Sequence, residues 1–291
     1  MDYADDTTYS CSETYLQTLS EKLAAKYKLL SEFLISNRLK LNDDKTHLLV
    51  LTTSQTRRRS GGFQNVVIST PEADIRPTPC EKLLGAWIHQ DLKWSEHLQD
   101  NDENLLKALT TRLSALKMVG KVASLQTRKM IADGIFISKL SYLISVWGGC
   151  EGYLARSLQI IHNKVARLVT KKSWYTPVKI LLAECGWLSV RQLAMYHTVL
   201  IVYKVLKTGT PSYISSMFST DYMRMTRQAL QGVIKPSPMR SVARQELANK
   251  SFRFRAVNED NCLPVQIKEA TSPNLFKKSA KKWIMENIPI D

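Results

Sequence analysis

Two adjacent aspartates, Asp5 and Asp6, follow Tyr3 and Ala4 at the beginning of the printed chain. On a regular strand their side chains would point to opposite faces, but in the tight turn of a hairpin both can approach one point. Two carboxylates held close repel each other, and a bound divalent cation removes that cost. Magnesium accepts carboxylate oxygens and keeps room for substrate phosphates. Asp5 and Asp6 are therefore candidate metal ligands, with an ordinary Asp-rich turn as the alternative.

Two further segments follow the aspartates in a particular order. "LKLNDDKT" occupies residues 39–46, and "KLLGAWIHQDLKWSEHL" occupies residues 82–98. With the Tyr-Ala-Asp-Asp sequence before them, these segments resemble the reverse transcriptase of non-LTR (LINE-like) retrotransposons. The resemblance runs from the catalytic Asp-Asp box to the end of the chain, and it is more specific in the three boxes than in the helical remainder.

The resemblance implies roles for particular residues. Asp5 and Asp6 would lie on the palm hairpin and bind Mg²⁺, with Mn²⁺ as a substitute. Lys45 is similar to a lysine that assists the pyrophosphate leaving group. The box that resembles the primer grip, which holds the end of the growing strand, contains Leu83, Leu84 and Gly85. The implied partners are an RNA template, an RNA–DNA or DNA duplex and, in an active enzyme, deoxynucleoside triphosphates.

The same family places a further essential aspartate on a strand well before the Asp-Asp box, together with the fingers. Only Met1 and Asp2 precede Tyr3 here. We therefore expect an N-terminally truncated RNA-directed DNA polymerase of a retrotransposon that does not polymerise by itself. Two alternatives stay open: a non-catalytic nucleic-acid-binding module derived from the thumb, and an inert remnant.

Charge is distributed unevenly along the 291 residues. Residues 1–98 carry 12 Lys/Arg and 13 Asp/Glu, whereas residues 99–291 carry 29 and 13, so the second part holds all of the net +15. A field of this sign attracts a phosphate backbone. On one helix face of that part, the candidate nucleic-acid-binding residues are Lys164, Arg167 and Lys171, with a solvated face as the alternative.

Hydrophobic periodicity predicts an α+β fold. The resemblance implies that residues 1–98 form a partial palm with short antiparallel strands and a long helix, residues 99–215 a mainly helical, thumb-like domain, and residues 216–291 a basic tail with a terminal helix. The chain's apolar stripes and end signals predict helices over 16–34, 106–116, 124–147, 154–168, 189–207 and 273–286. Strands are expected over 48–51, 65–70 and 82–88, and a loop over 54–62.

Other residue classes indicate no chemistry of their own. The five cysteines lack zinc-site spacing, and an intracellular setting, nuclear or cytoplasmic, with free thiols is expected. No secretory signal or membrane span is predicted. His97 and His162 are expected to be surface or packing residues rather than ligands. The tryptophans expected in the core are Trp87, Trp94, Trp147 and Trp187.

Overall fold

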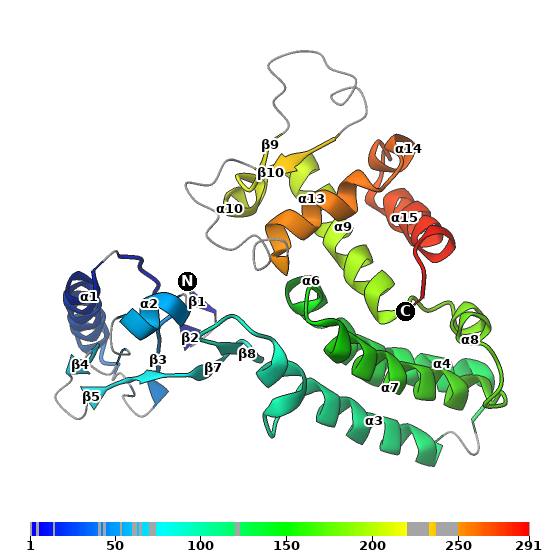
Figure 1. Cartoon of the computed structure of the whole chain (residues 1–291), viewed down its shortest axis with the longest axis horizontal. Helices are drawn as coiled ribbons and strands as arrows, with labels where there is room; N and C mark the ends of the chain where they lie inside the picture. Colours follow the sequence, from blue (N-terminus) through cyan, green and yellow to red (C-terminus); the bar gives the residue numbers. More distant parts are fainter. Residues whose placement is uncertain are drawn as a thin grey trace. The chain divides into compact units, whose positions relative to one another are not determined.

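The chain has a mixed α+β structure that divides into two compact units, Met1–Glu96 and His97–Asp291 (Figure 1). The computed structural model describes residues 2–3, 6–13, 15–39, 42, 45–52, 54–59, 63, 66–69, 74–119, 123–219, 233–236 and 250–290. The division after Glu96 lies close to the boundary predicted after residue 98. Residues 216–291, predicted as a separate tail, belong to the same unit as the helices before them.

Unit 1 combines one long helix with very short strands. Its described elements are β1 (Asp2–Tyr3), β2 (Asp6–Thr7), α1 (Leu16–Ser36), β3 (Leu48–Leu49), α2 (Ser54–Arg59), β4 (Ile68–Ser69), β5 (Asp74–Ile75), β6 (Pro77–Thr78), β7 (Cys80–Leu83) and β8 (Ala86–His89). The antiparallel pairs are β1–β2, β4–β5 and β7–β8, and β3 pairs with β6 in parallel. Each described sheet has two strands.

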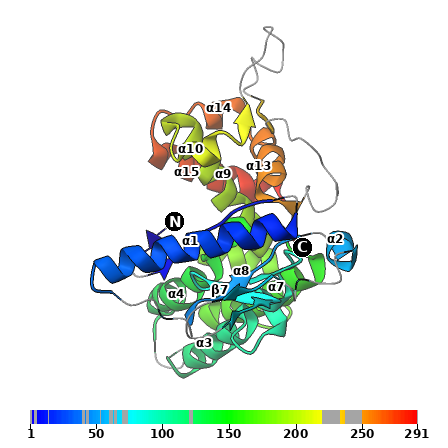
Figure 2. The same ribbon diagram turned by 90° about the vertical axis from the view of Figure 1, so that its left-hand side faces the viewer.

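Helix α1 confirms the predicted apolar stripe, although it buries that stripe only in part. Figure 2 shows the helix as one continuous element. Leu16, Leu23 and Tyr27 pack against a small core that comes from the strands and the loops near them. This core consists of Leu48, Val50, Phe63, Val66, Ile68 and Ile75. No residue of α1 is fully buried, so the contact stabilises the helix less than a closed core would.

Two predicted segments of unit 1, the loop over 54–62 and the strand in "KLLGAWI", differ from the structure. The loop predicted over 54–62 is wrong in its first part, because Ser54–Arg59 forms α2. Gln and Arg are good helix formers, and this stretch contains neither Gly nor Pro. Arg57 also anchors the helix, since its Nη2 lies 2.7 Å from Asp91 Oδ1. The strand expected in "KLLGAWI" is instead a hairpin, in which Leu83 pairs with Ala86.

Unit 2 is almost entirely helical. Its described elements are η2 (Glu96–Asp100, which begins at the last residue of unit 1), α3 (Leu105–Val119), α4 (Leu125–Ala132), η3 (Asp133–Ile137), α5 (Ser138–Ser141), α6 (Ile144–Trp147), α7 (Gly152–Thr170), α8 (Val178–Cys185), α9 (Val190–Thr208), α10 (Ser212–Ser215), β9 (Phe218–Ser219), β10 (Lys235–Pro236), α13 (Phe252–Asn261), α14 (Val265–Lys268) and α15 (Pro273–Asn287). Strands β9 and β10 pair antiparallel.

Two long helices organise this unit. Helix α7 packs against α3, α4 and α8, while α9 packs against α6, α13 and α15. The predicted stripe of α7 is buried at Leu154, Leu158, Ile161 and Val165, and Leu168 is half-buried beside the fully buried Val169. Helix α9 begins with a capping box between Ser189 and Gln192 and ends at Gly209, which confirms its predicted extent.

The single helix predicted over 124–147 is wrong. The chain forms α4, the wider turn η3 and α5, and then breaks at Tyr142 and Leu143, where Leu143 has a φ of 54°. The break frees the Tyr142 carbonyl, which accepts a hydrogen bond from Trp147 Nε1 at 2.9 Å. Ile144 and Trp147 are then both fully buried, so tertiary packing outweighs helix continuity.

The C-terminal helices are locked onto α9 by specific contacts. Gln192 Nε2 donates to the carbonyl of Ile288 at 2.6 Å, and Tyr203 stacks on Phe276 with ring centroids 4.0 Å apart. Helix α15 begins at Pro273, as predicted, and the structure shows Ser272 as its cap. None of the helices in the described ranges is long and apolar enough to cross a membrane.

Candidate nucleic-acid interface

The Asp-Asp segment lies next to a short hairpin. Strands β1 and β2 pair antiparallel, with Tyr3 opposite Asp6. Asp6 is exposed. Asp5 and Ala4 lie outside the described residues, between the two strands in sequence. The register is that expected for a hairpin with a two-residue connection.

No metal site is recognisable among the described residues, since no three His, Cys, Asp or Glu side chains come together there. Asp5, the first of the two candidate ligands, lies outside the described residues. The donor set itself suits a hard cation, because carboxylate oxygens are the ligands that Mg²⁺ and Mn²⁺ prefer. The proposed pairing of Asp5 with Asp6 therefore stays a prediction.

Lys45 is tied to Asn42 by hydrogen bonds. Its backbone N–H lies 3.1 Å from the Asn42 carbonyl oxygen and 3.3 Å from Asn42 Oδ1. The hydroxyl of Thr46 donates to the same carbonyl at 2.9 Å. Asn42 thus accepts the Lys45 N–H through both its backbone carbonyl and its side chain. The Lys45 side chain is exposed and makes no ion pair with a described residue.

The segment predicted to hold the end of a growing strand is a tight turn. Leu84 and Gly85 connect β7 to β8, and their φ angles are 47° and 81°. Positive φ at both central residues is the geometry of a type I′ hairpin. Glycine adopts it freely, but leucine does so at a steric cost. Leu83 and Leu84 are half-buried and Gly85 is exposed, so this turn presents backbone at the surface.

The three predicted cations of α7 do not behave alike. Lys164 and Lys171 are exposed, whereas Arg167 is half-buried. Lys171 caps the helix with a φ of 54°. The guanidinium of Arg167 lies 4.6 Å from the centroid of the Trp174 ring, and its Nη2 approaches the Trp174 carbonyl oxygen at 3.4 Å. Arg167 therefore organises the following loop as well as carrying charge.

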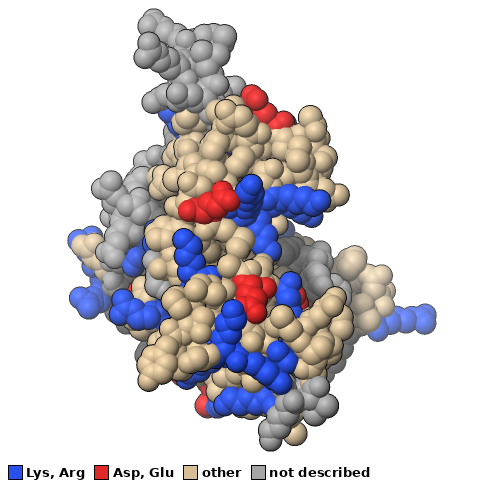
Figure 3. All heavy atoms as spheres, turned by 90° about the vertical axis from the view of Figure 1, so that its right-hand side faces the viewer, with Lys and Arg blue, Asp and Glu red and all other residues tan. Residues whose placement is uncertain are grey.

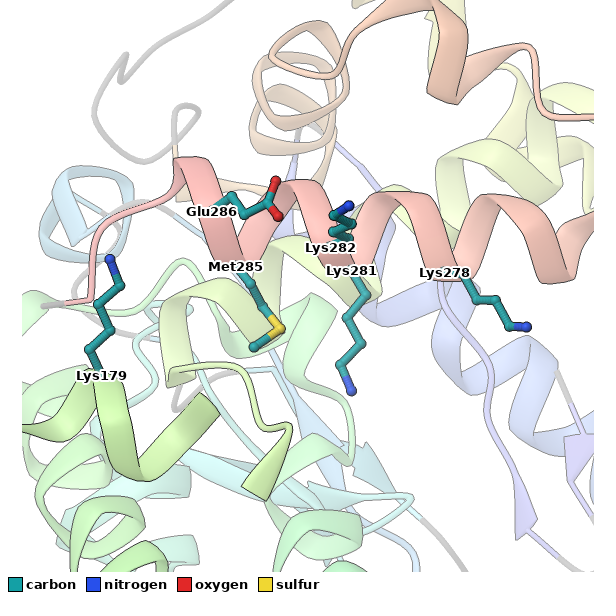
Figure 4. Close-up of a pocket in the computed structure, with 6 residues that line it drawn as sticks. All are labelled: Lys179, Lys278, Lys281, Lys282, Met285 and Glu286. Atoms are coloured by element: carbon teal, nitrogen blue, oxygen red, sulfur yellow. The ribbon is translucent and has the colours of Figure 1, made fainter. Parts of the chain in front are cut away.

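A second group of cations surrounds a hollow of about 550 Å³ between α8 and α15. Figure 4 shows Lys179 extending from α8, and Lys281 and Met285 pointing from α15 toward the same space. The lining residues are Lys179, Lys278, Lys281, Lys282, Met285 and Glu286. Four cations thus share the hollow with one acid, an arrangement that favours an anion.

Lys281 connects this hollow to a smaller one. It also lines a cavity of about 190 Å³ together with Lys129 and Asp133. Partial burial lowers the pKa of Lys281, the charge of Lys129 lowers it further, and Asp133 opposes the shift. A phosphate placed between the two lysines would relieve their repulsion. Figure 3 views the side on which α8 and α15 lie, and Lys and Arg side chains gather there with few acids among them.

The histidines and tryptophans are packing groups. His162 is fully buried between the rings of Phe136 and Trp187, at centroid distances of 6.1 and 5.5 Å. Burial lowers its pKa to about 4. His97 is buried too, which confirms helix packing rather than surface placement for both. Trp147 and Trp187 are buried as predicted, and Trp87 and Trp94 are half-buried.

The sequence interpretation missed several basic residues and one aromatic pair. Lys129 and Lys179 come from helices distant in sequence from α15, so their convergence has no local signal. Trp174 and Tyr175 did have a local sequence signal, because they follow two lysines in "KKSWYTP". Comparison with known protein families, with curated proteins and with solved structures found no match.

Proposed function

We propose that this chain is part of an RNA-directed DNA polymerase of a non-LTR retrotransposon. In this proposal unit 1 contributes palm motifs, and unit 2 acts as a thumb that holds nucleic acid by its phosphates. The observation that carries it is the lysine-lined hollow between α8 and α15, in a unit with 29 Lys/Arg and 13 Asp/Glu. A basic helical surface can follow a duplex backbone without reading sequence.

Two features of unit 1 support the polymerase origin. Strands β1 and β2 pair antiparallel with Tyr3 opposite Asp6, and Asp6, one of the two acids that the resemblance assigns to a metal, is exposed. The β7–β8 hairpin exposes backbone at Gly85, where a strand end could approach without meeting a side chain. Both features occur in the order that the resemblance implies.

The chemistry would depend on a divalent cation held by Asp5 and Asp6. Mg²⁺ bound there supplies charge stabilisation for phosphoryl transfer. The exposed Lys45 side chain is a candidate to assist a leaving pyrophosphate. The family that these boxes resemble uses a further aspartate beside the two that correspond to Asp5 and Asp6. We therefore expect these 291 residues alone to bind an RNA–DNA hybrid without extending its primer.

Binding is tested by titrating a fluorescein-labelled RNA–DNA hybrid at several salt concentrations. The affinity should fall steeply and linearly on a log–log plot. The double variant Lys278→Gln/Lys282→Gln should reduce the magnitude of the slope by about 2. Both side chains are exposed, so the fold should survive. The matched control is Lys26→Gln/Lys28→Gln on α1, which removes the same charge from unit 1 and should leave the slope unchanged. A salt-independent affinity would refute phosphate binding.

The catalytic part needs its own measurements. Primer extension with Mg²⁺ should yield no product above the Asp5→Asn/Asp6→Asn background, and extension by the native chain would refute this part. Paramagnetic broadening by Mn²⁺ should be strongest near Thr7 and Thr8 and should disappear in the double variant. Hybrid binding without such broadening would favour the non-catalytic binding module instead. If the chain shows neither hybrid binding nor Mn²⁺ broadening, the inert remnant is the alternative that fits.

A further inference from the structure

Two aromatic side chains stand at the tip of a turn that links α7 to α8. The backbone N–H of Thr176 donates to the Ser173 carbonyl at 3.0 Å, which closes the turn around Trp174 and Tyr175. Their side chains are 69% and 92% exposed. By contrast, Trp147 and Trp187 of the same unit are 0% and 6% exposed. Other large apolar side chains of this unit are exposed too, Met118 and Tyr213 among them, but among its described residues Trp174 and Tyr175 are the two exposed rings that are adjacent in sequence.

The turn is held in place from both sides. On the α7 side, the Arg167 guanidinium stacks on Trp174 at 4.6 Å from the ring centroid. On the α8 side, Lys172 Nζ lies 2.6 Å from Glu184 Oε2. These contacts limit the loss of conformational freedom when a ligand binds to the rings. They also occupy Glu184, the acid nearest the turn on α8, so the surroundings stay positive.

Cations flank the rings along the chain. Lys164 and Lys171 precede the turn, and Lys179, which lines the hollow, follows it at the start of α8. All three are exposed. Exposed aromatic rings can stack on flat groups of a ligand, and the lysines beside them can bind its negative charges. A ligand that fits this arrangement alternates flat aromatic groups with negative charges. A nucleic-acid strand with unstacked bases has this composition, whereas a duplex hides its base faces.

We propose that Trp174 and Tyr175 bind unpaired nucleotides of a single strand by stacking, while Lys164, Lys171 and Lys179 hold its phosphates. This inference rests on the proposed function and deepens it, because it names the unpaired strand as a second ligand beside the duplex. Sequence preference is not expected, since every base offers a π-face. A protein partner with an acidic, apolar surface is the competing occupant.

The experiment titrates native protein with a single-stranded oligothymidine of about 12 nucleotides, in the range of known site sizes. Trp174 is the exposed tryptophan among the six of this chain, so its fluorescence should be quenched by base stacking. The labelled RNA–DNA hybrid serves as the second probe. Measurement at high salt separates stacking from charge, because the phosphate contribution weakens there.

Three test variants and one control variant sharpen the result. Tyr175→Ala changes a side chain that is 92% exposed, so folding should be unaffected. It should weaken oligothymidine binding roughly ten-fold and hybrid binding less than about two-fold. With a fluorescein-labelled oligothymidine as the probe, Trp174→Ala should weaken binding, whereas Trp174→Phe should keep most of the affinity. Tyr213→Ala, at a 68% exposed ring on α10 of the same unit, is the matched control and should change neither affinity.

The outcomes separate the two proposals. Hybrid binding without oligothymidine binding would overturn this inference and leave the proposed function standing. Failure of both probes would defeat the proposed function as well. Equal weakening of both probes by Tyr175→Ala would show that the rings do not distinguish unpaired bases. Unchanged oligothymidine affinity in both alanine variants would assign the rings to another partner, such as a protein.

Discussion

The two units differ in how well they bury their own residues. Unit 2 has fully buried large side chains on several helices, among them Trp147, Phe136 and Phe276. Among its described residues, unit 1 has strands of two to four residues, a core cluster of six buried residues and a long helix with no buried position. The residues that resemble catalytic boxes are therefore in the less consolidated unit, and the proposed contacts to nucleic acid are in the better packed one.

This difference suggests which activity the chain can maintain by itself. Two-stranded sheets are marginal without further support, and a metal site needs ligands held within a fraction of an ångström. Contact with a phosphate backbone needs only charge on a stable scaffold. Binding should therefore tolerate more structural change than chemistry does.

The largest expected effect concerns unfolding of the two units. Backbone amides of α1 and the strands of unit 1 should exchange with solvent at opening free energies at least roughly 3 kcal/mol below those of α7 and α9. The physical reason is the smaller buried apolar area in unit 1. Native-state hydrogen exchange resolved by peptide measures this directly. Equal protection in both units would abolish the comparison.

A close backbone approach within unit 2 gives the next effect. A Cβ at Gly149 would lie less than 3.0 Å from the Lys250 carbonyl oxygen, and Arg255 Nη1 is also near. Gly149→Ala should therefore destabilise unit 2 by about 3 kcal/mol, in a urea titration that follows helix content. At Gly152 no atom lies within 4 Å, so Gly152→Ala is the matched control and should cost nothing. Equal losses from both changes would contradict the steric explanation.

The buried histidine of unit 2 predicts a pH dependence. Both ring nitrogens of His162 lack a hydrogen-bond partner among the described residues, and its pKa is lowered to about 4 from the ordinary 6.5 by burial. As the pH falls below 6.5 the unfolded chain takes up this proton first, so stability falls until about pH 4. At pH 5 the loss should be about 2 kcal/mol.

Two substitutions isolate this contribution. His162→Leu should flatten the pH dependence and raise stability at neutral pH, because it also removes an unpaired polar group. His162→Gln should also flatten the pH dependence, but it should not raise stability at neutral pH. His97, whose pKa is also about 4, still titrates in both variants, so the comparison concerns the difference from native protein. An unchanged slope in His162→Leu would assign the acid sensitivity elsewhere.

The sequence predicted those elements whose signals are local. The stripe of α7, the stop of α9 at Gly209 and the start of α15 at Pro273 depend on spacing and caps within a few residues. The break at Leu143 could not be predicted, because it depends on Trp147 reaching the Tyr142 carbonyl. The candidate site divides in the same way. Lys164, Arg167 and Lys171 follow from helix spacing, whereas the convergence of Lys179 with α15 needs the tertiary fold.

The smallest effect tests whether unit 2 can be stabilised further. Gly134 lies within η3 and is exposed, and a Cβ added to its backbone would meet no atom within 4 Å. Gly134→Ala should raise the stability of unit 2 by about 0.5–1 kcal/mol, mainly because alanine restricts the unfolded chain. Exchange rates in unit 1 should stay unchanged, since the two units pack their cores separately. If Gly134→Ala slowed hydrogen exchange in unit 1 as well, the two units would unfold together. They would then differ in how well their side chains are packed but not in stability.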